Sequence, residues 1–129
     1  MSKNVTVTSL IKKKEKLKNK TNKQVKLFVP SLDGEITVKA PDKALILEAL
    51  EIADKDNTVD PNEYLVLECC VEPNLKDPKL LAEFGYDTPL QLISSGDIFD
   101  QGEIISIADF LSELAGLNSK VTLVDNVKN

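Results

Sequence analysis

The sequence predicts an α+β protein that is mainly helical, with an N-terminal β-hairpin followed by a compact bundle of about five short helices. Two observations predict these elements: an alternating apolar segment surrounds the Asp33-Gly34 pair, and proline repeatedly follows a short polar residue, as at helix starts. The length of 129 residues suits one domain with a core of its own. We expect a marginally ordered lysine-rich arm (1–23), one globular domain (24–118) and a tail (119–129).

The N-terminal arm carries most of the positive charge. Residues 3–26 hold nine lysines and one glutamate, although the chain as a whole has a net charge of -5. Ser9 is expected to cap a helix that runs to Asn19, with a thin apolar face of Leu10, Ile11 and Leu17. Such a narrow face does not stabilise a helix alone, so the arm would need nucleic acid, its own body or an acidic partner.

The hairpin is predicted over residues 24–39. Val25, Leu27 and Val29 alternate with Lys26 and Phe28, and Ile36 and Val38 repeat the alternation on the return strand. The turn falls at residues 31–34.

Five helices are predicted after the hairpin, at residues 42–54, 61–71, 78–84, 89–95 and 101–115. Three of them start with the pattern of a capping box, which pairs Asp60 with Glu63, Thr88 with Gln91, and Asp100 with Glu103. Glycines 85, 96 and 116 stand where helices should end. The segment 63–71 is apolar on nearly every side, which predicts that its helix is central.

The chain contains no histidine and no arginine, which narrows its chemistry. Histidine is the commonest general base and metal ligand, and arginine is the usual bidentate partner of phosphate. We therefore predict a non-enzymatic protein without catalytic, cofactor-binding or metal-binding residues. An enzyme that uses Glu68, Glu72 or Cys69 ranks third among the functions considered, and the adjacent Cys69 and Cys70 are expected to be buried, reduced thiols.

A calcium loop is also considered and set aside. Residues 54–62 have its alternating oxygen ligands, but its glycine and glutamate positions hold Val59 and Leu65.

The segment from Leu90 to Ile105 holds more apolar side chains than two short helical pieces can bury at once, and Phe110 falls off the inward face of the last helix. Internal packing is the first interpretation, and the sharper alternative is that part of the cluster forms a groove or patch for an apolar partner segment. The predicted partner-binding residues are Leu90, Ile93, Ile98, Phe99, Ile105 and Phe110.

From about Leu27 to Gly116 the order of these signals resembles the XkdN-like tail assembly chaperones of contractile-tailed phages and defective prophages. The most distinctive match is the run Val71-Glu72-Pro73-Asn74-Leu75-Lys76-Asp77, supported by Asn62-Glu63-Tyr64-Leu65 and Gly102-Glu103-Ile104. The resemblance implies a small, mostly helical, non-enzymatic protein. It would bind the tape measure protein before the tail tube polymerises and be absent from the mature virion.

The partners expected from this resemblance are the tape measure protein and, as a second candidate, the tail tube protein. Self-association is a further expectation. No apolar run reaches the roughly 20 residues of a membrane span, and residues 1–22 lack a signal-peptide core, so we expect the host cytoplasm and no membrane partner. The alternative function is a nucleic-acid-associated accessory protein that uses Lys12 to Lys26.

Overall fold

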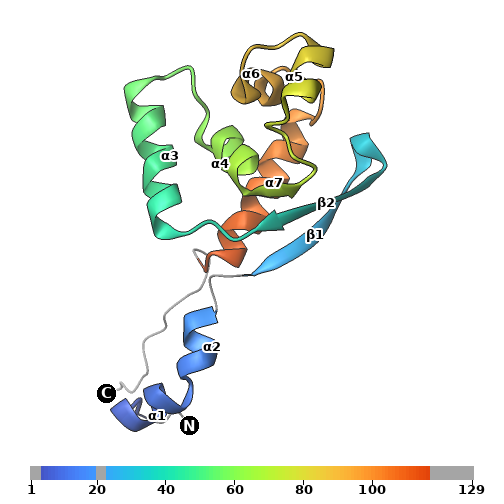
Figure 1. Ribbon diagram of the computed structural model, residues 1–129. Coiled ribbons are helices and arrows are strands. Elements are labelled where there is room, and N and C mark those ends of the chain that lie inside the picture. Colours follow the sequence, from blue (N-terminus) through green and yellow to red (C-terminus); the bar gives the residue numbers. More distant parts are fainter. Residues whose placement is uncertain (1–3, 20–22, 117–129) are drawn as a thin grey trace, which may run out of the picture.

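A computed structural model describes residues 4–19 and 23–116. The first range is here called the arm and the second the body. The arm contains α1 (Val7–Lys12) and α2 (Lys14–Asn19). The strands are β1 (Gln24–Val29), β2 (Gly34–Lys39) and β3 (Cys70–Glu72), and the remaining helices are α3 (Lys43–Lys55), α4 (Pro61–Cys69), α5 (Pro78–Phe84), α6 (Pro89–Ser94) and α7 (Gln101–Leu114). Figure 1 shows α7 crossing the sheet, α3 at one side, α5 and α6 at the far end from the arm, and the arm helices standing off the body.

The mixed helix-and-strand class is confirmed, and the predicted hairpin forms part of a larger sheet. β1 and β2 pair antiparallel, from Gln24 opposite Lys39 to Val29 opposite Gly34. The connection is a short 3-10 helix (η1, Pro30–Leu32) followed by Asp33 in the left-handed region at φ 49°. Asp33 donates its backbone N–H to the Pro30 carbonyl at 3.1 Å. Aspartate tolerates this conformation better than most residues with a side chain, which explains its place before Gly34.

The predicted helix 61–71 is wrong at its end, where a third strand begins. α4 stops at Cys69, and Cys70–Glu72 pairs antiparallel with β2 to give the order β1-β2-β3. Pro73 is the physical reason. A proline ring clashes with the carbonyl four residues earlier in a helix and drives the preceding residue into extended geometry. Helical continuation through Glu72 is therefore disfavoured.

α4 lies at the centre, as predicted, and contacts α3, α6, α7 and β3. Val66 and Cys69 have no exposed surface. α7 packs one face inward, where Ile104, Ile107, Ala108 and Leu111 are all buried. The core is completed by side chains of the sheet, the β3–α5 connection and the segment before α7: Val29, Ile36, Val38, Leu75, Ile93 and Phe99.

The caps of the later helices follow the predicted pattern with one exception. α5 has the predicted bounds, and α3, α6 and α7 differ by one residue at one or both ends. Thr88 and Gln91 form a capping box. Asp60 does cap α4, accepting from the Asn62 N–H at 2.8 Å, but Glu63 turns inward instead of completing a box. Glu63 is only 8% exposed, and its carboxylate accepts a hydrogen bond from the Ser94 hydroxyl of α6 at 2.6 Å.

The arm also differs from the predicted single helix. Thr6, not Ser9, is the cap of α1, and its hydroxyl accepts from the Ser9 N–H at 3.1 Å. The helical run is interrupted at Lys13, which leaves two helices of six residues each. Ser9 completes the box by accepting from the Thr6 N–H at 3.0 Å. The N-terminal cap of α1 is therefore formed by residues close together in the sequence.

Candidate partner-binding surface

The structure does not bring the six predicted partner-binding residues together. Ile93 and Phe99 are each 1% exposed and belong to the core, so their prediction as surface residues is corrected. Leu90 and Ile98 are half-buried against the same core. Only Ile105 and Phe110 are exposed, at 49% and 48%. The other four residues pack into or against the core around α4, which is the internal packing that is the first interpretation of this segment.

Ile105 and Phe110 cannot share one contact surface. They are five residues apart on α7, which places them about 140° apart around the helix axis. Phe110 lies on the side of Glu103 and Ser106, next to β1. A partner that touches one of these two residues would not touch the other from the same direction.

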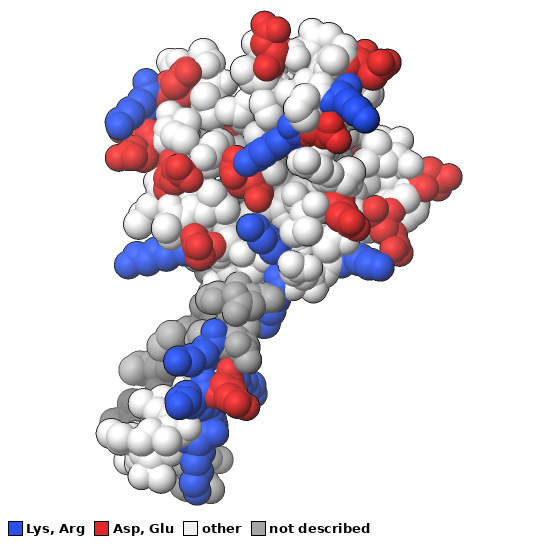
Figure 2. Space-filling model, viewed as in Figure 1, with Lys and Arg blue, Asp and Glu red and all other residues white. Residues whose placement is uncertain are grey.

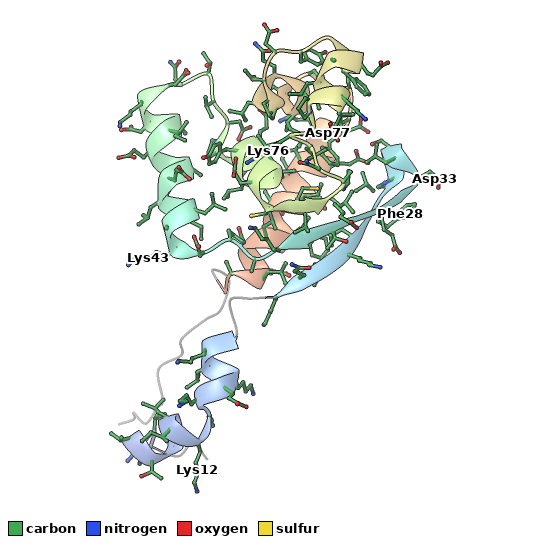
Figure 3. The ribbon with its side chains drawn as sticks, in the orientation of Figure 1. Lys12, Phe28, Asp33, Lys43, Lys76 and Asp77 are labelled. Atoms are coloured by element: carbon green, nitrogen blue, oxygen red, sulfur yellow. The ribbon has the colours of Figure 1, made fainter. Side chains whose placement is uncertain are left out.

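Phe110 instead shares a hollow with the hairpin. This hollow has a volume of about 60 Å³ and lies between β1 and α7, lined by Leu27, Phe28, Val29, Pro30, Glu103, Ser106, Ile107 and Phe110. We call it, with its two flanking aromatic residues, the Phe28–Phe110 surface. Phe28 is 62% exposed, the highest value of any aromatic residue described in the body. Figure 3 shows it projecting outward from the hairpin.

Phe28 is not among the six predicted partner-binding residues, although it lies in the hairpin of residues 25–38, which is the next candidate if the binding face lies elsewhere. Phe28 occupies a polar position in the alternation of β1, where Val25, Leu27 and Val29 face inward. A phenylalanine at a solvent-facing position of a strand is a large exposed apolar side chain. Such residues mark interaction sites when others join them.

β1 is an edge strand of the described sheet, so one row of its backbone groups has no strand beside it there. Ala40 donates its N–H to the Lys23 carbonyl at 2.9 Å, and antiparallel bonding then alternates along the strand. Gln24, Lys26 and Phe28 consequently direct their N–H and C=O groups away from β2. The Phe28–Phe110 surface therefore wraps around an edge that also offers backbone hydrogen bonds.

Two hydrogen bonds hold the walls of the hollow together. Ser31, in the hairpin turn, donates its N–H to Oε2 of Glu103 at 2.9 Å and its hydroxyl to Oε1 at 2.6 Å. Oε1 also accepts the Asp100 N–H at 2.9 Å, which completes the predicted pairing at the start of α7. These donors, with the Ser31 hydroxyl first, lower the pKa of Glu103. The charged carboxylate thus fixes the hairpin against α7.

A second, wider hollow of about 640 Å³ lies beside the sheet, and Glu72, Pro73 and Asn74 of the distinctive run line it together with residues of the hairpin. Three other residues of this run have structural roles. Leu75 is a core residue at 2% exposure, and Asp77 caps α5 by accepting from the Lys79 N–H at 2.9 Å. Lys76 forms an ion pair with Glu68 at 2.8 Å, and Figure 3 shows where Lys76 and Asp77 lie.

The candidate chemical groups occupy structural positions. Cys69 is a buried free thiol and Cys70 a half-buried one, and burial raises the pKa of each to about 11. Asp56 accepts hydrogen bonds from the N–H and hydroxyl of Thr58, which lower its pKa. Within residues 4–19 and 23–116, no group of three or more acidic or cysteine side chains could hold a metal ion.

Charge separates the arm from the body. Figure 2 shows mostly basic side chains on the arm, whereas the visible face of the body carries many acidic side chains with several basic ones among them. The arm also exposes apolar side chains, led by Val7 at 74% and Ile11 at 65%. None of the helices in the described part of the chain is long and apolar enough to cross a membrane.

Exposed aromatic residues beside a hollow at a strand edge are features that protein-binding surfaces often have. A family model described as phage XkdN-like tail assembly chaperone protein matches residues 3–128, so the chain belongs to this family. The comparisons with curated proteins and with solved structures found no match. The protein is therefore a phage tail assembly chaperone by family.

Proposed function

We propose that this chaperone binds an apolar helical segment of the tape measure protein at the Phe28–Phe110 surface before the tail tube polymerises. The observation that carries the proposal is a pair of exposed phenylalanines, Phe28 at 62% and Phe110 at 48%. They lie on the hairpin and on α7, which the hydrogen bond between Ser31 and Glu103 joins. A tape measure protein is a very long helical chain, and its apolar stripes would stay in water until the tube encloses it. Capture of such a stripe keeps the chain from aggregating.

The size of the hollow limits the contact. A volume of about 60 Å³ is about twice the share of one water molecule in the liquid, so it accepts the end of one side chain. Phe28 and Phe110 supply the remaining apolar area on either side, in the way that aromatic anchors usually carry an interface. A segment that lies along the free edge of β1 reaches both.

The test is co-purification with the tape measure protein of the same phage after co-expression. Phe28→Glu and Phe110→Glu should each weaken capture about tenfold or more, while the melting temperature changes by only a few degrees. Phe84→Glu is the matched control, because Phe84 is 42% exposed on α5 and outside the surface. Full capture by both variants would overturn the site. Failure of the unmodified protein to capture the tape measure protein would overturn the function.

The same proposal covers the tail tube protein as a second partner, the host cytoplasm as the place of action and absence from the mature virion. Catalysis forms no part of it. The alternative function, nucleic-acid binding through Lys12 to Lys26, is supported by the exposed lysines of the arm. The arm lacks the arginines and interleaved aromatic residues that usually grip nucleic acid, so we expect no retarded band in a gel shift at physiological salt.

A further inference from the structure

The arm presents an apolar stripe that nothing described covers. Val7, Leu10 and Ile11 follow helical spacing on α1 and are 74%, 48% and 65% exposed, and Leu17 of α2 is 38% exposed. Helices of six residues are marginal in water unless a neighbour packs on their apolar side. The locally encoded cap at Thr6 gives α1 a defined start, so its stripe is ready for a partner.

The lysines of the arm indicate which charge the partner should carry. Residues 12–18 contain five lysines and one glutamate. A partner should therefore combine apolar and acidic side chains, because opposite potentials across an interface favour the encounter.

The outer face of α3 has this combination. Leu47 and Leu50 are 54% and 56% exposed and lie three residues apart, so they are neighbours on the helix surface. Exposed Glu48, Glu51 and Asp54 accompany them. An open hollow of about 620 Å³ along this face is lined by Ala44, Leu47, Glu48 and Glu51. Figure 1 shows α3 at the edge of the body.

We infer that the arm of one molecule docks on the outer face of α3 in a second copy of the chain. The apolar stripe of α1 covers Leu47 and Leu50, and the lysines of the arm face Glu51 and Asp54. A second copy of the chain is the partner that we infer, because α3 has charge opposite to that of the arm and an apolar surface that matches its stripe. The arm and α3 are different surfaces, so reciprocal exchange of two arms closes a two-fold dimer, whereas one-way exchange gives larger assemblies.

Nucleic acid and membrane surfaces fit the arm less well. Both would meet the lysines, but residues 1–26 contain no aromatic side chain to stack on a base or to anchor in a lipid interface. A protein face with carboxylates beside leucines satisfies both the charge and the apolar stripe.

A charge-swap experiment on the full chain tests the inference. In the first variant, Lys12→Glu and Lys16→Glu make the arm acidic. In the second, Glu51→Lys and Asp54→Lys make α3 basic. Glu48 is kept, because burial and this carboxylate raise the pKa of Tyr64 to about 12 and a change there would disturb α4. Sedimentation velocity over a concentration series measures self-association of each protein and of their equimolar mixture.

The unmodified protein should self-associate, each variant alone should dissociate at least about tenfold more readily, and the mixture should recover association. Recovery in the mixture requires contact between different molecules, since neither variant can satisfy its own arm. Glu83→Lys with Asp87→Lys is the control, with the same change of charge on other exposed positions, and should associate like the unmodified protein.

Three outcomes overturn the inference. An unmodified protein that stays monomeric at all concentrations would show that the arm does not dock on a second copy. A mixture that stays dissociated would show that charge does not join these two surfaces. Arm-dependent binding of duplex DNA or of anionic vesicles by monomeric protein at physiological salt would assign the arm to those partners instead.

Discussion

Ser31 and Glu103 are 72 residues apart in the sequence, yet two hydrogen bonds of 2.9 and 2.6 Å join the turn of the hairpin to the first turn of α7. Hydrogen bonds to a charged acceptor contribute more than neutral ones. Glu103→Ala should therefore lower the free energy of unfolding by about 1–2 kcal/mol. Chemical denaturation of this variant beside Glu113→Ala, an exposed glutamate on the same helix, measures the difference.

The same pair predicts a pH dependence. The folded pKa of Glu103 is lowered, so the unfolded chain binds more protons at acidic pH. The stabilisation is present above the unfolded pKa of about 4.3 and is lost as pH falls through the folded pKa. The stability gap between the unmodified protein and Glu103→Gln should be constant near pH 7 and shrink below about pH 4. A gap that grows on acidification would contradict this account.

A second prediction concerns Glu63, which is 8% exposed and whose carboxylate accepts a hydrogen bond from the Ser94 hydroxyl at 2.6 Å. Removing that donor leaves a buried acceptor with one partner fewer. Ser94→Ala should cost about 1–2 kcal/mol, whereas Ser106→Ala on α7 should cost less than about 0.5 kcal/mol. Equal effects in thermal unfolding would show that the bond between α4 and α6 contributes no net stability.

Glu63 also shows what local sequence patterns could and could not predict. The start of α4 was predictable because Asp60 and Pro61 act on adjacent backbone groups. The direction of the Glu63 side chain was not, because it depends on Ser94, 31 residues away. The same holds for β3, a strand of three residues that exists because β2 lies beside it.

The Phe28–Phe110 surface shows the same difference between what local sequence patterns predict and what depends on contacts between distant residues. An excess of apolar residues around α7 was visible in the sequence, and Phe110 is indeed exposed. The assignment of Ile93 and Phe99 to the surface was wrong because their burial requires α4 and the sheet, which arrive from elsewhere in the chain. Phe28 joins Phe110 only after Ser31 attaches the hairpin to α7. Contact with a partner remains a prediction for every residue of this surface.

The thiols give a third prediction. Cys69 has no exposed surface, Cys70 is half-buried, and burial raises the pKa of both to about 11. At pH 8 the reactive thiolate is then on the order of 0.1% of each, so labelling of the folded protein should be slow, and slowest at Cys69. Single Cys69→Ala and Cys70→Ala variants separate the two rates. Rapid labelling of both thiols in folded protein would show that α4 is not central.

The raised thiol pKa values also predict whether stability rises or falls at alkaline pH. The folded protein keeps its thiol protons where the unfolded chain has lost them, so stability falls as pH rises from about 8.5 towards 11. Replacing both cysteines with alanine should flatten this part of the profile, although it lowers stability at neutral pH through lost packing. An unchanged slope would assign the alkaline loss to other groups.

The last prediction separates core from surface by using two phenylalanines of the same segment. Phe99 is 1% exposed and packs in the core, so Phe99→Ala should cost about 3–5 kcal/mol. Phe110 is 48% exposed, so Phe110→Ala should cost less than about 1.5 kcal/mol while still weakening capture of the tape measure protein. Denaturant unfolding and co-purification, measured on both variants, give two independent readouts. A large stability loss in Phe110→Ala would place that ring in the core, and the free edge of β1 with Phe28 would then carry the interaction alone.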